Sequence, residues 1–139
     1  MKLRLQLVRD GETLFDVPLS PEDWTKKDLE EELKETEESF ERFSNIFDVL
    51  SHETRLRMMM RLVGADDRTL SFADFMQDLD LNPKIVWENS LKLEKDGLLE
   101  KTGRGKYVCS GFGETFMMIS LALRRLMESL EEMEQLQGR

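Results

Sequence analysis

Residues Asn82–Cys109 read NPKIVWENSLKLEKDGLLEKTGRGKYVC. Asn82 is a good N-cap for a helix, and Pro83 follows at the first helical position, where its missing N–H costs nothing. We predict that this helix runs to about Asp96 and ends at Gly97, a residue suited to the left-handed conformation of a C-terminal cap. The stretch therefore begins with a helix whose two ends are both marked in the sequence.

The second half of the same stretch predicts a β-hairpin. Leu98 and Leu99 open an extended segment, and residues 107–109 form its return strand. Between them, residues 102–106 (TGRGK) supply the glycines and polar groups of a tight turn. Residues 69–70 are expected to add a short third strand beside this hairpin. A capped helix that leads directly into a hairpin with a basic tip is typical of the end of a winged helix-turn-helix.

Two further helices are expected before this stretch. One begins at Ser51 and ends near Gly64. The other is capped by Ser71 and ends near Leu79, and residues 80–82 then form the turn of the helix-turn-helix. The expected fold class is mainly α (α+β), a winged helix-turn-helix with extensions at both ends.

Two motifs within residues 45–110 resemble those of ArsR-type winged-helix transcriptional regulators. Residues 47–57 (FDVLSHETRLR) resemble the opening motif of that family, L-S-x-x-T-R-L-R-I-L, and residues 82–99 are similar without gaps to its recognition helix and the exit from it. The resemblance implies a cytoplasmic dimer that binds double-stranded operator DNA and represses or activates transcription.

Residues 1–19 lie outside the resemblance and predict a second hairpin. Leucines at 3, 5 and 7 alternate with polar residues, and Asp10-Gly11 suits a two-residue turn. A helix is then expected from Ser20-Pro21 to about Leu50. Its glutamates between residues 30 and 41 predict a solvated face. The alternative is that this face mimics phosphate and competes with DNA for the basic hairpin.

The last helix follows Gly111 and carries a heptad pattern. Its apolar positions are Phe116, Ile119, Leu123, Leu126, Leu130 and Met133. We expect these residues to form a homodimer seam, and the alternative is a helix that packs wholly on its own domain. The chain is thus expected to divide into an N-terminal hairpin and acidic helix (1–50), the winged helix-turn-helix (51–110) and a dimerisation helix (111–139).

The charge of the chain is distributed unevenly. The net charge is −9 for 139 residues, made up of −7 in residues 1–50, zero in 51–110 and −2 in 111–139. The predicted DNA-binding part is therefore neutral, which is a poor starting point for neutralising phosphates. The sequence has no secretory signal pattern and no apolar stretch approaching eighteen residues, so a cytoplasmic protein without a membrane partner is expected.

Catalytic and metal-binding chemistry is not expected. The chain has one histidine, His52, and one cysteine, Cys109. They do not make up a catalytic set or a transition-metal site, so we expect no enzyme activity, no metal and no cofactor. Cys109 lies on the predicted return strand, where a packed thiol is a simpler expectation than a sensor.

The candidate DNA-binding residues come from the helix and the hairpin of the opening stretch. On a helical projection, one polar face holds Lys84, Glu88, Lys92 and Lys95, and the hairpin adds Arg104 and Lys106. Glu88 can accept a hydrogen bond from a cytosine amino group. The family's usual histidine position is Asn89 here, and its usual inward leucine is Ser90.

Trp87 and Leu91 leave the functional prediction open. The simpler expectation places Trp87 in the core, and the alternative makes Trp87 and Leu91 an exposed apolar patch for a protein partner. The leading interpretation is a dimeric DNA-binding transcriptional regulator. The alternatives are a winged-helix protein-interaction module with weak or no DNA binding, and a ligand-responsive regulator whose N-terminal extension forms the effector pocket.

Overall fold

The computed structural model describes residues 3–137. It forms two compact units that divide between Ser44 and Asn45. In the described residues, no helix combines the length and the apolar character that crossing a membrane requires.

The first unit contains the predicted N-terminal hairpin. Strands β1 (Arg4–Arg9) and β2 (Glu12–Pro18) are antiparallel. Asp10 and Gly11 between them have φ angles of +51° and +81°. Positive φ at both positions is what a type I′ hairpin turn requires, which explains the Asp-Gly pair. In the register Leu5 lies opposite Val17 and Leu7 opposite Phe15, so apolar side chains share one face.

The prediction of one helix from Ser20 to Leu50 is wrong at its start. Residues Pro21–Asp23 form a 3₁₀ turn (η1), and Trp24 is extended, with φ −96° and ψ 147°. The Trp24 indole N–H donates to the carbonyl of Pro18 at 3.0 Å, which ties this residue to the hairpin rather than to a helix. Helix α1 (Lys26–Glu38) begins only after Thr25, whose side chain accepts from the Asp28 N–H.

The same predicted helix also breaks in the middle, although it ends close to Leu50 as expected. Ser39 closes α1 with φ −95° and ψ 7°, and α2 (Phe40–Ser51) follows. Ser51 does not cap the next helix, because its hydroxyl donates to the Asp48 carbonyl within α2 at 3.2 Å. The extended residue before α3 is His52, with φ −102° and ψ 105°, so the predicted helix start at Ser51 is wrong by two residues.

The second unit contains the helix-turn-helix with the predicted caps. Helix α3 (Glu53–Gly64) is followed by the turn η2 (Asp66–Arg68), then by α4 (Phe72–Leu79) and α5 (Pro83–Lys95). Ser71 and Asp74 form a reciprocal capping box at the start of α4, and the Asn82 side chain accepts from the Ile85 N–H at 2.9 Å. Asp80, with φ +51°, reverses the chain between α4 and α5.

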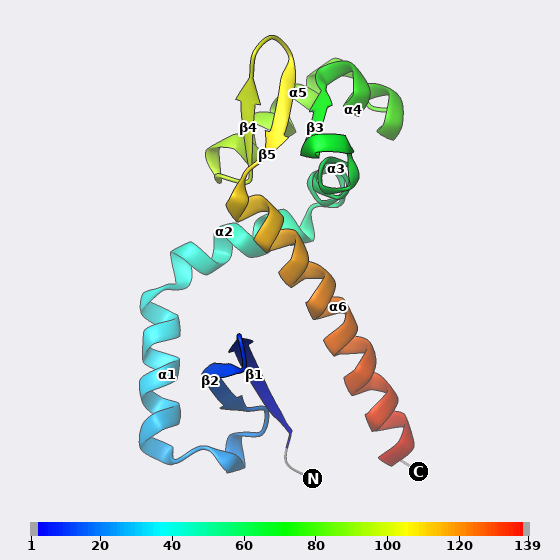
Figure 1. Ribbon diagram of the computed structural model, residues 1–139. Coiled ribbons are helices and arrows are strands. Elements are labelled where there is room, and N and C mark those ends of the chain that lie inside the picture. The colour runs from blue at the N-terminus through cyan, green and yellow to red at the C-terminus, as the bar shows by residue number, and fades with distance from the viewer. Residues whose placement is uncertain (1–2, 138–139) are drawn as a thin grey trace. The chain divides into compact units, whose positions relative to one another are not determined.

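The wing is a three-stranded antiparallel sheet. Strands β3 (Thr69–Ser71), β4 (Leu99–Thr102) and β5 (Lys106–Cys109) lie in the order β3-β5-β4. Figure 1 shows β4 and β5 joined by a tight loop, with β3 on the other side of β5. Gly97 enters β4 with φ +79°, as expected of the left-handed cap that ends α5. The predicted winged helix-turn-helix, including its third strand, is confirmed.

Helix α6 (Gly111–Gln137) starts against the wing and the core. The Ser110 hydroxyl donates to the Gly97 carbonyl at 2.6 Å and accepts from the Gly113 N–H at 2.8 Å, which joins the helix start to the exit from α5. The core of this unit consists of Val49, Met58, Met59, Leu62, Phe75, Leu79, Val86, Leu93, Leu98, Leu99, Tyr107, Cys109, Phe116 and Met117. The expected packed thiol at Cys109 is confirmed, because that side chain is buried.

Candidate nucleic-acid interface

The outward face of α5 differs from that of a purely polar recognition helix. Val86 and Leu93 have no exposed surface and anchor the opposite, inward face of the helix. Trp87 is 57% exposed and Leu91 44% exposed. The expectation that Trp87 lies in the core is therefore wrong, because the inward positions are filled by smaller aliphatic side chains. The exposed residues of α5 after Pro83 are Lys84, Trp87, Glu88, Leu91, Glu94 and Lys95.

The two uncharged polar side chains of α5 that follow Glu88 are turned inward. Asn89 is 7% exposed: its Oδ1 accepts from the Arg55 guanidinium at 3.1 Å, and its Nδ2 donates to the Ile85 carbonyl at 2.8 Å. Ser90 is 2% exposed and donates to the Trp87 carbonyl at 3.0 Å. Both side chains have their hydrogen bonds satisfied inside the protein, so neither is available to a base edge.

Lys92 is held in an ion-pair cluster at the edge of this face. Its ammonium lies 3.4 Å from the Asp96 carboxylate and 4.0 Å from that of Asp48. Asp48 also pairs with Arg55 at 3.0 Å, and the Lys92 side chain is 30% exposed. The cluster brings α2, α3 and α5 together. The spacing of Lys92 and Asp96 is a signal of their pair in the sequence, but Asp48 and Arg55 lie far from Lys92 along the chain and give none. The positive charge of Lys92 is therefore largely matched within the protein.

Lys84 and Glu88 form a looser pair on the open surface. Their charged groups are 3.9 Å apart, and their side chains are 81% and 54% exposed. An exposed pair one helical turn apart is weak and screened by salt, so both groups stay available to a partner. Lys95, one turn further along the same exposed face than Leu91, forms no ion pair with residues 3–137.

The wing carries three exposed cations on a well-defined turn. Lys101, Arg104 and Lys106 are all exposed. The turn between β4 and β5 is sharp because Gly103 and Gly105 have φ angles of +57° and +63°. The Gly105 carbonyl accepts from the Phe72 N–H at 2.7 Å, which fixes the base of the wing loop to the start of α4. The wing is thus held to the helix-turn-helix while its cationic side chains remain in solvent.

The predicted seam on α6 is partly exposed. Phe116 is 4% exposed and belongs to the core of its own unit, so the accessible part of the heptad pattern begins at Ile119. Ile119 is 62% exposed and Leu123 42% exposed. The three later seam residues are half-buried: Leu126, Leu130 and Met133.

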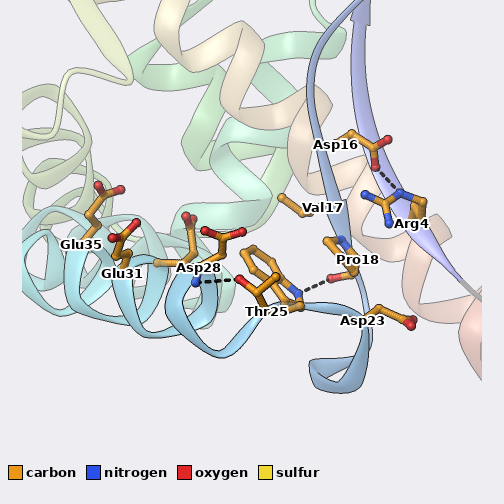
Figure 2. A pocket seen from close by; sticks show the side chains of 11 residues that line it. Arg4, Asp16, Val17, Pro18, Asp23, Thr25, Asp28, Glu31 and Glu35 are labelled. Carbon is orange, nitrogen blue, oxygen red and sulfur yellow. Dashed lines mark hydrogen bonds and ion pairs between the residues drawn. The ribbon is translucent and has the colours of Figure 1, made fainter.

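The first unit contains a separate acidic pocket of about 420 Å³. Figure 2 shows Arg4 paired with Asp16 on one wall and Thr25, Asp28, Glu31 and Glu35 on the other. The hydrogen bond from the Gln6 amide, followed by the Arg4 guanidinium, lowers the pKa of the Asp16 carboxyl below its ordinary value. The Asp16 carboxyl is therefore ionised at neutral pH, where it pairs with Arg4. This unit lies outside the residues that resemble ArsR-type regulators.

The Cys109 thiol is expected to be unreactive at neutral pH. Burial, with a smaller contribution from the nearby Glu114 carboxylate, raises the pKa of this thiol to about 11, while Arg68 opposes the shift. A thiol with so high a pKa is protonated at neutral pH and is a weak nucleophile. In the described residues, no three side chains of the metal-binding types lie together as a site.

The chain is similar to known proteins in its structure rather than in its sequence. No family model matches the chain, and no curated protein sequence matches it. Among solved structures, the chain is similar to a crystal structure with 17% sequence identity and a TM-score of 0.47, a match that covers 64% of this chain and 92% of the other. That structural neighbour is an ArsR family transcriptional regulator.

Proposed function

We propose that the protein is a homodimeric DNA-binding transcriptional regulator, rather than an enzyme, that contacts duplex DNA through α5 and the wing. The observation that carries this proposal is the exposure of cations on both elements of the winged helix-turn-helix. Lys84 and Lys95 lie on the outward face of α5, and Lys101, Arg104 and Lys106 lie on the wing. A helix in the major groove with an adjacent basic hairpin on the backbone is a docking geometry that such an arrangement suits.

The number of available cations sets the expected salt dependence. Four exposed cations of this surface form no ion pair within residues 3–137, namely Lys95, Lys101, Arg104 and Lys106. If a dimer uses between half and all of its eight such groups, the slope of log K against log salt should lie between about −4 and −7. Binding to duplex DNA should therefore be measurable in low salt and weak near physiological ionic strength.

The decisive experiment is a salt titration of binding to random duplex DNA, comparing the wild type with Arg104→Ala/Lys106→Ala. Loss of two cations per subunit should weaken binding to every sequence and flatten the slope by about 2 to 4. Glu12→Ala/Glu53→Ala is a control that changes charge on exposed residues outside α5 and the wing. Equal binding by the wild type and the wing variant would contradict the mechanism.

The homodimer rests on the apolar side chains that α6 leaves in solvent. Ile119 and Leu123 are adjacent on the heptad seam, and two such helices could cover each other. Sedimentation at micromolar concentration should show a dimer for the wild type and a monomer for Ile119→Glu/Leu123→Glu, because two charges would enter an apolar seam. Ser129→Glu, an exposed position of the same helix off the seam, is the matched control. A monomeric wild type would exclude this part of the proposal.

A second candidate function has one specific observation in its favour. Trp87 and Leu91 are exposed on a helix face whose charged residues, two lysines and two glutamates, cancel. This arrangement also suits a winged-helix module that binds another protein. Absence of binding to duplex DNA at low ionic strength would favour this alternative, and Trp87→Ala would then be the variant to test against protein partners.

A further inference from the structure

We propose that α5 recognises thymine, with Trp87 and Leu91 contacting thymine C5-methyl groups in the major groove. This inference rests on the proposed DNA-binding function and adds to it the class of base that the helix selects. Thymine is the base that presents a methyl group in the major groove, and apolar side chains are its natural contacts.

Trp87 and Leu91 occupy neighbouring positions on the outward face of α5. Trp87 and Leu91 are four residues apart, so their side chains are neighbours on the helix surface. At 100° per residue, Leu91 falls between Trp87 on one side and Lys84 and Lys95 on the other. Their exposed fractions of 57% and 44% place them on the outward face of the second helix of the helix-turn-helix. This is the surface that enters the groove when such a fold binds DNA.

The two uncharged side chains of α5 that could read bases by hydrogen bonds, Asn89 and Ser90, are turned inward. Asparagine is the usual hydrogen-bond partner of adenine. The Asn89 amide instead accepts from the Arg55 guanidinium at 3.1 Å and donates to the Ile85 carbonyl at 2.8 Å. Ser90 is buried and donates to the Trp87 carbonyl. What remains on the outward face is the apolar pair and the charged groups around it. Of these groups, the apolar pair is the one suited to a thymine methyl group, whereas the exposed lysines and Glu88 suit guanine and cytosine.

The small area of this apolar patch and the charges around it suit DNA better than a protein partner. A standard protein interface buries about 800 Å² on each partner, whereas a tryptophan and a leucine at these exposures offer a small part of that area. The patch is bordered by Lys84, Lys95, Glu88 and Glu94, whose charges cancel, and the wing supplies the excess of cations with Lys101, Arg104 and Lys106. Cations that border a narrow apolar ridge are complementary to a groove whose floor carries methyl groups and whose rims are phosphates.

The experiment begins with duplexes selected by the full-length wild type from a random library at low salt. The best binder is then resynthesised with single thymines replaced by deoxyuridine, which removes the methyl group and keeps the base pair. At thymines under α5, each replacement should weaken binding about fourfold, which is equivalent to the 0.8 kcal/mol expected for burying one methyl-sized group. Replacement in both half-sites of a dimer should weaken it about fifteenfold, the product of two such steps.

The variant Trp87→Ala/Leu91→Ala should bind thymine and uracil duplexes equally, because it lacks the contacting groups. Both substitutions are at exposed positions, so the fold should persist, and circular dichroism checks this. Lys95→Ala is the matched control on the same face: it should weaken both duplexes by the same factor and keep the ratio between them.

The possible results are separable. Tight duplex binding that is insensitive to every uracil replacement overturns the thymine inference and leaves the DNA-binding proposal intact. A preference for thymine that persists in Trp87→Ala/Leu91→Ala overturns it as well, since another element would then read the methyl group. Failure of the wild type to bind any duplex in low salt would remove both proposals and favour a protein partner.

Discussion

Replacing Gly113 by alanine should disrupt the junction between the wing and α6. Gly113 is buried in the first turns of α6, and a Cβ atom built there would lie 2.1 Å from the Leu98 carbonyl oxygen and 3.0 Å from the Cys109 sulfur. The backbone of Gly113 is helical, so alanine is compatible with its φ and ψ. The conflict is therefore one of space, and the neighbouring backbone must move to relieve it.

The loss of stability can be worked out from the contacts that this movement weakens. The Leu98 carbonyl accepts from the Ser110 N–H at 3.1 Å, and the Ser110 hydroxyl donates to the Gly97 carbonyl at 2.6 Å. Moving α6 outward by about 1 Å, enough to restore van der Waals contact, lengthens both bonds. Overpacking costs about 1–3 kcal/mol and the two weakened hydrogen bonds together about 1 kcal/mol, so the free energy of unfolding should fall by about 2–4 kcal/mol.

Urea unfolding followed by circular dichroism, at one fixed protein concentration, measures this change. Gly111→Ala is the matched control, because it lies two residues earlier in the same helix and has no atom within 4 Å of the added methyl group. That variant should be unchanged or more stable by up to about 1 kcal/mol, since alanine favours the helix. Unfolding of Gly113→Ala at the same urea concentration as Gly111→Ala would show that no steric conflict exists at Gly113.

Two other predictions concern the N-terminal hairpin and the buried thiol. Deletion of residues 1–19 should lower the melting temperature, because the Trp24 indole would lose its acceptor at Pro18; an unchanged melting curve and oligomeric state would contradict a structural role. Cys109 should resist alkylation at pH 8 until denaturant is added, because its thiol has a pKa of about 11. Burial raises that pKa above the ordinary thiol value of 9.0, so the free energy of unfolding should be independent of the thiol below pH 9 and fall as pH rises from 9 toward 11. A flat profile over that range would count against burial of the thiol.

The elements that could be predicted from sequence are those fixed by neighbours a few residues away. Asn82 caps α5 through a residue three positions later, Gly97 ends it through its own positive φ, and Asp10-Gly11 forms the first hairpin turn. These choices depend on local geometry, so a single sequence contains the necessary information. The wing and the order of the helices follow from them.

The helix boundaries near Trp24 and His52 could not be predicted in the same way. Trp24 has a reasonable helix propensity, and it is extended here because its indole bonds to Pro18, a contact that depends on where the hairpin ends. At the other boundary, Ser51 satisfies its hydroxyl inside α2, although serine is a frequent cap. Both outcomes are decided by contacts outside the local pattern.

In the candidate site, too, contacts between distant residues decide which side chains are available to DNA. A helical projection places Lys92 on the open face, but its ammonium pairs with Asp48 and Asp96. Asn89 accepts a hydrogen bond from Arg55, which lies 34 residues earlier in the chain. Once Lys92 and Asn89 are excluded, the charged residues on the outward face of α5 cancel, and Trp87 is exposed on that face. The wing, in contrast, has three cations against Glu100. Affinity for phosphates should therefore come mainly from the wing and base selection mainly from α5, so variants of the two elements should separate the salt slope from sequence preference.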